Sequence, residues 1–284
     1  MTTLNYSLIG ANGDSITFDY TNYVLNEGMR GHGIPATQVR IDESAGPGGV
    51  WRFSKRGVRE IDMAVTVLGT DRADVETKLR RLSRLIQDTS GPTILKAEYS
   101  DSTSLTLGVH YTTGAESTWG ADEGLIWCKW ILSFKAPQPY WESTTIQSAS
   151  VTTGNTGRGL LPELSKLKIT SSQAIGVISV NNTGDVPVYP TYAVRGPVTD
   201  LFISNGTQSF SFNTPVLPGE TITVNTATGT VTDDTGANRY SILNAAPKLF
   251  PLLPGTSSIT VNGVEADTNT RITLNYALQY EVVH

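Results

Sequence analysis

The stretch Ile131-Leu-Ser-Phe-Lys-Ala-Pro-Gln-Pro-Tyr-Trp141 divides the chain, because a long β-patterned run ends there at two closely spaced prolines. Apolar residues recur at every second position from Leu125 to Ala136, which predicts a strand with one dry face and one mixed face. That face carries Ile126, Cys128, Trp130, Leu132 and Phe134. Pro137 and Pro139 cannot donate to a sheet ladder and keep the backbone extended. We therefore expect the strand to end before them and a stiff connector to follow.

Length and composition indicate a β-rich chain with two domains. The 284 residues include 27 Gly and 14 Pro, and two domains of about 140 residues would each bury a core. The predicted fold class is mainly β. Its parts are an N-terminal β domain with one α-helix at 1–140, a linker or irregular lead-in at 141–163, and a C-terminal β-sandwich or jelly roll at 164–284.

Charge and the first residues exclude several classes of function. Lys and Arg number 21 against 26 Asp and Glu, a net charge of −5, so direct nucleic-acid binding is disfavoured. The chain begins without a secretory pattern and holds no run of about 18 apolar residues. We expect a protein made in a cytoplasm and not inserted in a membrane. The one cysteine, Cys128, excludes an intrachain disulfide and is read as a small buried hydrophobe in preference to a reactive thiol.

The first half shows a hairpin, several strands and one helix. Asn12-Gly13 predicts the turn of a hairpin over Tyr6–Asp19. An amphipathic helix follows a strand at Arg59–Leu68, with Thr70 or Asp71 as the N-terminal cap. Its apolar stripe, interpreted as core packing, consists of Val75, Leu79, Leu82 and Ile86. Further strands are expected at Thr93–Tyr99, Leu105–Tyr111 and Leu125–Phe134.

Residues 27–57 are dense in glycine and predict strands joined by long mobile loops, with Val39 and Ile41 as the clear strand-like core. This half also gathers the cations Arg30, Arg40, Arg52, Lys55, Arg56 and Arg59. Two interpretations stay open for them: a solvated rim, or a contact surface for an acidic partner subunit.

After Pro162 short strands alternate with turn signals such as Asn205-Gly206 and Asn262-Gly263, which is typical of a sandwich or jelly roll. The expected strands are Leu164–Thr170, Ala174–Val180, Tyr189–Arg195, Asp200–Ser204, Ser209–Asn213, Thr221–Asn225, Thr230–Thr232, Arg239–Leu243, Ser257–Val261 and Arg271–Val282.

No residue pattern predicts catalysis, a cofactor or a metal. His32, His110 and His284 lack metal-ligand spacing, and Gly46-Pro-Gly48-Gly49 lacks the following helix that a phosphate loop needs. Asp14 with Asp19 and Asp233 with Asp234 are candidate calcium ligands, and Glu98 with Asp101 and Asp122 with Glu123 are candidate glycosidase carboxylates. Ordinary acids of turns and loops are the favoured interpretation. We therefore predict no enzyme.

Several segments together resemble the distal tail protein (Dit) family of siphophages. In the second half these are Asn181-Asn-Thr-Gly-Asp185, Tyr189-Pro-Thr191, Gly196-Pro-Val, Leu217-Pro-Gly-Glu220, Thr228-Gly-Thr-Val231 and Tyr276-x-x-x-Tyr280. In the first half they are Gly57-x-Arg59-x-Ile61, Leu82-x-x-Leu-Ile86 and Ala136-Pro-Gln-Pro-Tyr-Trp141. The likeness covers nearly the whole chain as an ordered pattern of β elements and turns.

The resemblance implies a virion structural protein at the distal end of the phage tail. Its N-terminal domain would form a homo-oligomeric ring, a hexamer in the family, that joins the tail tube to tail-tip, fibre or receptor-binding proteins. Its C-terminal domain would be a galectin-like sandwich. The alternative is a carbohydrate-binding adhesin of the tail tip, with Trp119 or the sandwich loops contacting a host glycan.

Overall fold

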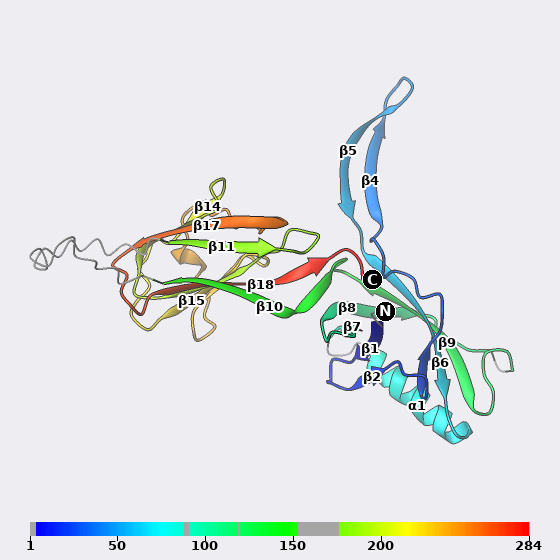
Figure 1. Cartoon of the computed structure of the whole chain (residues 1–284). Coiled ribbons are helices and arrows are strands. Elements are labelled where there is room, and N and C mark those ends of the chain that lie inside the picture. Colours follow the sequence, from blue (N-terminus) through cyan, green and yellow to red (C-terminus); the bar gives the residue numbers. More distant parts are fainter. Residues whose placement is uncertain (1–3, 88–90, 119, 153–175, 284) are drawn as a thin grey trace, which may run out of the picture. The chain divides into compact units, whose positions relative to one another are not determined.

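The computed structural model describes residues 4–87, 91–118, 120–152 and 176–283. The chain forms two compact units, and the predicted mainly β fold class is confirmed (Figure 1). Unit 1 comprises Met1–Thr145 together with Gln279–His284, and unit 2 comprises Ile146–Leu278. These units differ from the predicted ranges 1–140 and 164–284, since the last residues of the chain return to unit 1.

Two β-sheets enclose the core of unit 1. In the first, β2 (Ser15–Thr17) pairs with β1 (Leu4–Ile9), then β7 (Thr93–Tyr99) and β8 (Ser104–Thr113) follow. In the second, β3 (Tyr23–Leu25) pairs with β6 (Arg59–Leu68), and β6 with β9 (Trp127–Ala136). The apolar residues of β6 and β9 alternate as predicted, so Ile61, Met63, Leu132 and Phe134 are all buried. Ile126, assigned to the same dry face, is instead 53% exposed and precedes the strand.

Helix α1 (Arg72–Ile86) packs against β6 and β9 through the predicted stripe, in which Val75, Leu82 and Ile86 are buried. Leu85, which the stripe omitted, is buried as well. The predicted cap is Asp71, whose carboxylate accepts a hydrogen bond from the Asp74 N–H at 2.9 Å. Within the described residues this helix lacks the length and apolar content that crossing a bilayer requires.

The Asp71 cap supports a first prediction. We expect Asp71→Ala to lower the free energy of unfolding by about 1 kcal/mol, because the Asp74 N–H at the start of the helix loses its acceptor. Asp71→Asn, which keeps an acceptor oxygen, should stay within a few tenths of a kcal/mol of the parent protein. Urea unfolding followed by circular dichroism measures both, and equal losses in the two variants would contradict the capping role.

Residues 141–163 were expected to form a linker, and that prediction is wrong for Trp141–Thr152, which form β10. Trp141 is fully buried in unit 1, whereas the following side chains are exposed or half-exposed. A strand without a dry face needs no apolar alternation, which explains why its Ser- and Thr-rich sequence gave no strand signal. Residues 153–163 and the predicted strand Leu164–Thr170 lie outside the described residues.

Unit 2 is a two-sheet sandwich. One sheet contains, in order, β16 (Thr230–Thr232), β15 (Thr221–Asn225), β12 (Thr191–Arg195), β18 (Arg271–Tyr280) and β10. The other contains β11 (Gly176–Asn182), β17 (Gly255–Val264), β13 (Thr199–Ser204) and β14 (Ser209–Ser211). Its core includes Tyr192, Phe210 and Phe250, whose rings pack edge-on or tilted at centroid distances of 5.4–6.4 Å.

Two local predictions in unit 2 are wrong. Arg239–Leu243 is no strand, since Tyr240–Ile242 form a short 3-10 turn. Asn262-Gly263, read as a turn, lies inside β17, where Gly263 packs closely against Val198 and Asn262 pairs with Phe202. Asn-Gly favours a turn only where the flanking strands are free to pair with each other, and β17 pairs instead with β11 and β13.

Candidate assembly interface

A hairpin of unit 1, formed by β4 (Thr37–Glu43) and β5 (Gly49–Arg56), exposes a cluster of large apolar side chains. Within the part of the chain that the structure describes, the two strands pair only with each other and form a separate two-stranded sheet (Figure 1). Their large apolar side chains are uncovered, and Trp51 is 62% and Ile41 59% exposed. The others are Val39, Val50 and Phe53. The prediction that Val39 and Ile41 form a core between loops is therefore wrong.

The hairpin collects three of these apolar side chains on one face. Ile41 lies opposite Trp51, and Val39, two residues along the same strand, lies opposite Ser54. The Trp51 Nε1–H donates a hydrogen bond to Ser54 Oγ at 2.9 Å, which fixes the indole on that face. At the tip, Ser44 Oγ donates to the Gly46 and Gly48 carbonyl oxygens, and Gly48 has a φ of 99°. The tip is thus ordered by hydrogen bonds from the Ser44 hydroxyl to its own backbone.

The other face carries charged side chains together with Val50 and Phe53, which lie opposite Asp42 and Arg40. Asp42 accepts hydrogen bonds from Arg40 Nε at 3.2 Å and from Arg52 Nε at 2.6 Å, so two cations share one carboxylate. The Lys55 ammonium lies 6.0 Å from the centre of the Phe53 ring. Four cations stand against two acids within residues 37–56. The hairpin therefore combines an apolar face with an excess of positive charge.

An isolated two-stranded hairpin is at best marginally stable in water, and contiguous exposed apolar side chains mark interaction sites. No described residue of the chain covers Trp51, Ile41 or Val39, which are all more than half exposed. The arrangement fits a surface that a partner covers.

The base of the hairpin is fixed by Arg59, which is only 1% exposed. Its guanidinium donates to the carbonyl oxygens of Pro139, Gly33 and Glu281, each at 2.6 Å, and also to that of Gly31. Burial lowers the pKa of Arg59 to about 10, so the side chain stays protonated at neutral pH. One cation thus ties together the loop before β4, the start of β6, the connector after β9 and the C-terminal segment.

The C-terminal segment also contacts the hairpin directly. Glu281 pairs with Arg56, the last residue of β5, at 2.6 Å between Oε1 and Nη2. Val283 is 1% exposed, and its N–H donates to the His32 carbonyl at 3.1 Å. Residues 279–283 therefore brace the segments that lead into and out of the hairpin.

The structure separates the six cations that the sequence grouped. Arg40, Arg52, Lys55 and Arg56 lie on the hairpin, whereas Arg59 is buried and is no part of a solvated rim. The apolar residues Val50, Trp51 and Phe53 were missed. Their signal was present, since Val39-x-Ile41 and Val50-Trp51-x-Phe53 flank a Ser- and Gly-rich turn as hairpin strands do.

The acidic pairs weighed as metal or catalytic sites have structural partners. Asp14 pairs with Arg81 at 2.7 Å, Glu98 with Lys96 at 2.8 Å and Glu123 with Arg72 at 3.0 Å. The Asp101 and Asp233 carboxylates accept hydrogen bonds within their own turns. Across the described ranges no three His, Cys, Asp or Glu side chains gather as a metal site would need.

The other candidate residues of the sequence analysis are the cysteine, the histidines and Trp119. Cys128 is buried as predicted, and burial raises the pKa of its thiol. His32 lies in the loop before the hairpin, and His110 is in β8. Trp119 and His284 lie outside the described residues.

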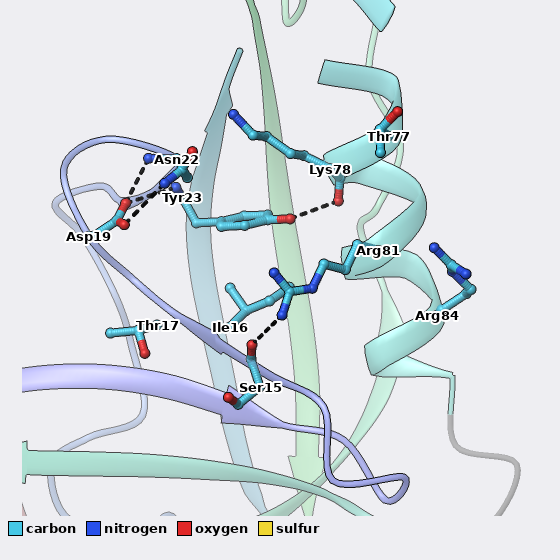
Figure 2. Close-up of a pocket in the computed structure, with 10 residues that line it drawn as sticks. All are labelled: Ser15, Ile16, Thr17, Asp19, Asn22, Tyr23, Thr77, Lys78, Arg81 and Arg84. Atoms are coloured by element: carbon cyan, nitrogen blue, oxygen red, sulfur yellow. Dashed lines mark hydrogen bonds between the residues drawn. The ribbon is translucent and has the colours of Figure 1, made fainter. Parts of the chain in front are cut away.

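A groove of about 450 Å³ between α1 and the β2–β3 connection is lined largely by groups that bond to each other (Figure 2). Tyr23 Oη donates to the Lys78 carbonyl at 3.0 Å, and Arg81 donates to the Ser15 carbonyl at 2.9 Å. Asp19 Oδ1 accepts from the Asn22 N–H at 2.7 Å. These contacts join the helix to the sheet edge and serve the fold.

Asp19 supports a pH prediction. Hydrogen bonds from the backbone N–H groups of Asn22 and Thr21 hold the pKa of its carboxyl far below the usual range. Because the folded value is depressed, its contribution to stability is complete above the unfolded pKa of about 3.9 and is lost as the pH falls further. We expect Asp19→Asn to flatten the fall in melting temperature between about pH 4 and pH 2. An unchanged slope in thermal scans over that range would contradict this role.

Comparison with known proteins identifies a family match in unit 2 and solved structures with a similar fold. Residues 183–280 match the family model of the siphovirus-type tail component, C-terminal domain. A comparison with curated proteins found no match. Among solved structures, the chain is similar to the SPP1 Dit (gp 19.1) protein, described as a paradigm of the hub adsorption apparatus in phages that infect Gram-positive bacteria. The TM-score is 0.69 at 15% identity, with 96% of this chain and 98% of that chain covered.

The chain is also similar to a chain of the phage P2 baseplate in its activated conformation, solved with Ca and with Sr. Each match has a TM-score of 0.55 at 11% identity, and covers 99% of this chain and all of that chain. At these identities the structural likeness shows the fold.

The fold and the matched C-terminal domain define a class, the β-rich structural components of phage tails. Within that class, the predicted resemblance to the distal tail protein family is confirmed by the family match in unit 2 and by the fold of the whole chain.

Proposed function

We propose that this protein is a distal tail hub subunit that closes with copies of itself into a ring, a hexamer as the family resemblance implies. The observation that carries the proposal is the β4–β5 hairpin, whose apolar face is uncovered and whose base is braced by Arg59 and Glu281. Bracing matters because a presented arm loses less conformational freedom on binding than a loose loop.

An arm that inserts into a different surface of a neighbour makes a heterologous contact, and such contacts generate rings when the rotation between subunits closes. A subunit with one arm and one receiving surface is therefore suited to form an annulus.

In the assembled tail, this ring joins the tail tube to the tail-tip, fibre or receptor-binding proteins at the distal end of the virion, after synthesis in the host cytoplasm. The similar structures described as a hub of the adsorption apparatus and as a baseplate support that placement. The role is structural and involves no catalysis, cofactor, nucleic-acid binding or membrane insertion.

Mass photometry and negative-stain microscopy of the purified chain test the proposal, alone and with the tail tube protein of the same phage. We expect rings of uniform copy number, with six subunits as the first value to check. A chain that stays monomeric up to tens of micromolar, with and without the tube protein, would contradict the proposal.

One observation favours host-glycan binding as a second candidate. The outward side chains of β11, β17, β13 and β14 are mostly small and polar around Phe202, which is 38% exposed, with Val177, 60% exposed, as an apolar exception. They include Ser179, Ser258, Thr260, Asn262 and Ser211. Hydroxyl and amide groups beside an aromatic ring suit a neutral sugar. On a glycan array, Phe202→Ala should lose binding that the parent shows, and an array silent for the parent removes this candidate.

A further inference from the structure

A second groove in unit 1 combines apolar side chains with acidic ones, which complements the apolar, positively charged hairpin. It has a volume of about 330 Å³ and lies where the chain crosses from β2 to β3. Half of its lining residues are apolar or aromatic, namely Leu4, Tyr6, Phe18, Tyr20, Leu25 and Met29. The others are Asn5, Asp19, Asn26, Glu27, Gly28 and His32. Phe18 is buried at the edge of the core, whereas Tyr20 is 89% exposed.

The position of this groove explains why core residues are accessible there. Among the described strands, β2 pairs only with β1 and β3 pairs only with β6, so each is the edge strand of its sheet. Residues 18–22 cross from one sheet to the other at this side of the sandwich. The groove is therefore an opening between two sheet edges, a place where the core is incompletely covered.

The charges of the groove are acidic. Asp19 and Glu27 line it, and neither Lys nor Arg is among its lining residues. The backbone N–H groups that bond Asp19 keep it ionised, and burial raises the pKa of Tyr6 to about 12, as expected beside apolar neighbours. A ligand for this groove would be apolar, with positive charge at its margin.

The β4–β5 hairpin has those properties, with Val39, Ile41 and Trp51 on one face and Arg40, Arg52 and Lys55 along the strands. Its apolar side chains are exposed, so they do not occupy the groove of their own chain. We propose that the Tyr6–Phe18–Tyr20–Leu25–Met29 groove receives the β4–β5 hairpin of a second copy. This inference rests on the proposed ring function and names the two surfaces that meet in it.

Such a contact is heterologous, because each subunit would donate a hairpin and receive another in a different place. It would bury the indole of Trp51, and large aromatic side chains in desolvated pockets supply most of the energy of many interfaces. The opposite charges at the margin would set orientation and speed encounter more than they would raise affinity.

Site-specific photo-crosslinking tests the contact in the full chain. A benzophenone amino acid replaces Trp51, and the irradiated assembly is prepared from a mixture of ¹⁴N- and ¹⁵N-labelled protein so that interchain products are identifiable. Trypsin cleaves after Arg30, so every lining residue of the groove except His32 lies in the peptide 1–30. We expect interchain crosslinks within residues 4–29. The same probe at Leu253, which is 59% exposed in unit 2, is the matched control and should not reach that peptide.

The outcomes separate the two proposals. Rings whose Trp51 crosslinks map to other segments, or only within one chain, overturn the groove assignment and leave the ring function standing. The absence of any assembly, in solution or with the tube protein, overturns both.

A substitution in the groove gives an independent test. Tyr20→Lys removes an exposed ring and places a cation among the acids, so it should weaken assembly at least about tenfold without unfolding unit 1. Tyr240→Lys, at a 47% exposed position of unit 2, should leave assembly unchanged. A circular dichroism spectrum and melting temperature equal to the parent's confirm that Tyr20→Lys is folded. If the folded variant assembles like the parent, the groove assignment is wrong.

Discussion

Trp51→Asp is expected to convert the assembled protein into folded monomers. The indole is 62% exposed, so the substitution removes little packing within the chain, but it places a carboxylate in the middle of the apolar face. Truncating a buried aromatic anchor of an interface commonly costs 2–4 kcal/mol, which is about 30- to 1,000-fold in affinity. Burying an unpaired charge adds to that cost.

Sedimentation velocity across a concentration series measures the effect, and the melting temperature of the variant shows whether it is folded. Leu253→Asp is the matched control, since Leu253 is exposed to a similar extent but lies in unit 2. If Trp51→Asp forms rings with the same midpoint concentration of assembly as the parent protein, the hairpin is not the assembly surface.

Arg59→Met should produce the largest loss of folding stability among single substitutions outside the apolar core. Methionine fills much of the same volume but leaves the carbonyl oxygens of Gly31, Gly33, Pro139 and Glu281 without their shared donor. Unsatisfied buried polar groups cost about 1–3 kcal/mol each, and broken networks of this kind are seldom additive. We expect a loss of about 3–5 kcal/mol in the free energy of unfolding of unit 1.

Arg80→Met is the control, because the Arg80 side chain is 75% exposed on the outer face of α1 and should change stability by less than about 0.5 kcal/mol. Hydrogen exchange adds a second readout, because loss of the Arg59 contacts should also raise exchange across residues 37–56. Equal melting temperatures for Arg59→Met and Arg80→Met would contradict the bracing role.

The contrast between Arg59 and its neighbours shows where sequence reasoning stops. Arg52, Arg56 and Arg59 lie within eight residues and look alike as letters, yet one is on an exposed arm, one pairs at its base and one is buried. What distinguishes them is the set of carbonyl oxygens that residues 31, 33, 139 and 281 bring to one point. Contacts that span between 26 and 222 residues of sequence leave no local pattern.

Strands with one buried face were predictable for the opposite reason. The alternation in β6, β9 and β18 is imposed locally by the period of the pleat, so it is visible in any window of eight residues. β10 lacked such a signal because most of its side chains are not buried, and Asn262-Gly263 misled because neighbouring strands override a turn preference.

By itself, the sequence determined that the chain is β-rich, that it carries one capped helix after Arg59–Leu68, and that its pattern of turns resembles the distal tail proteins. These features follow from local periodicity and turn chemistry. Only the tertiary structure decided that Val39, Ile41 and Trp51 are exposed, that the chain's last residues return to unit 1, and that an acidic apolar groove opens between β2 and β3. The exposure of a side chain depends on which surfaces remain uncovered after the sheets have packed. The sequence alone does not distinguish an apolar residue of the core from one on an interface.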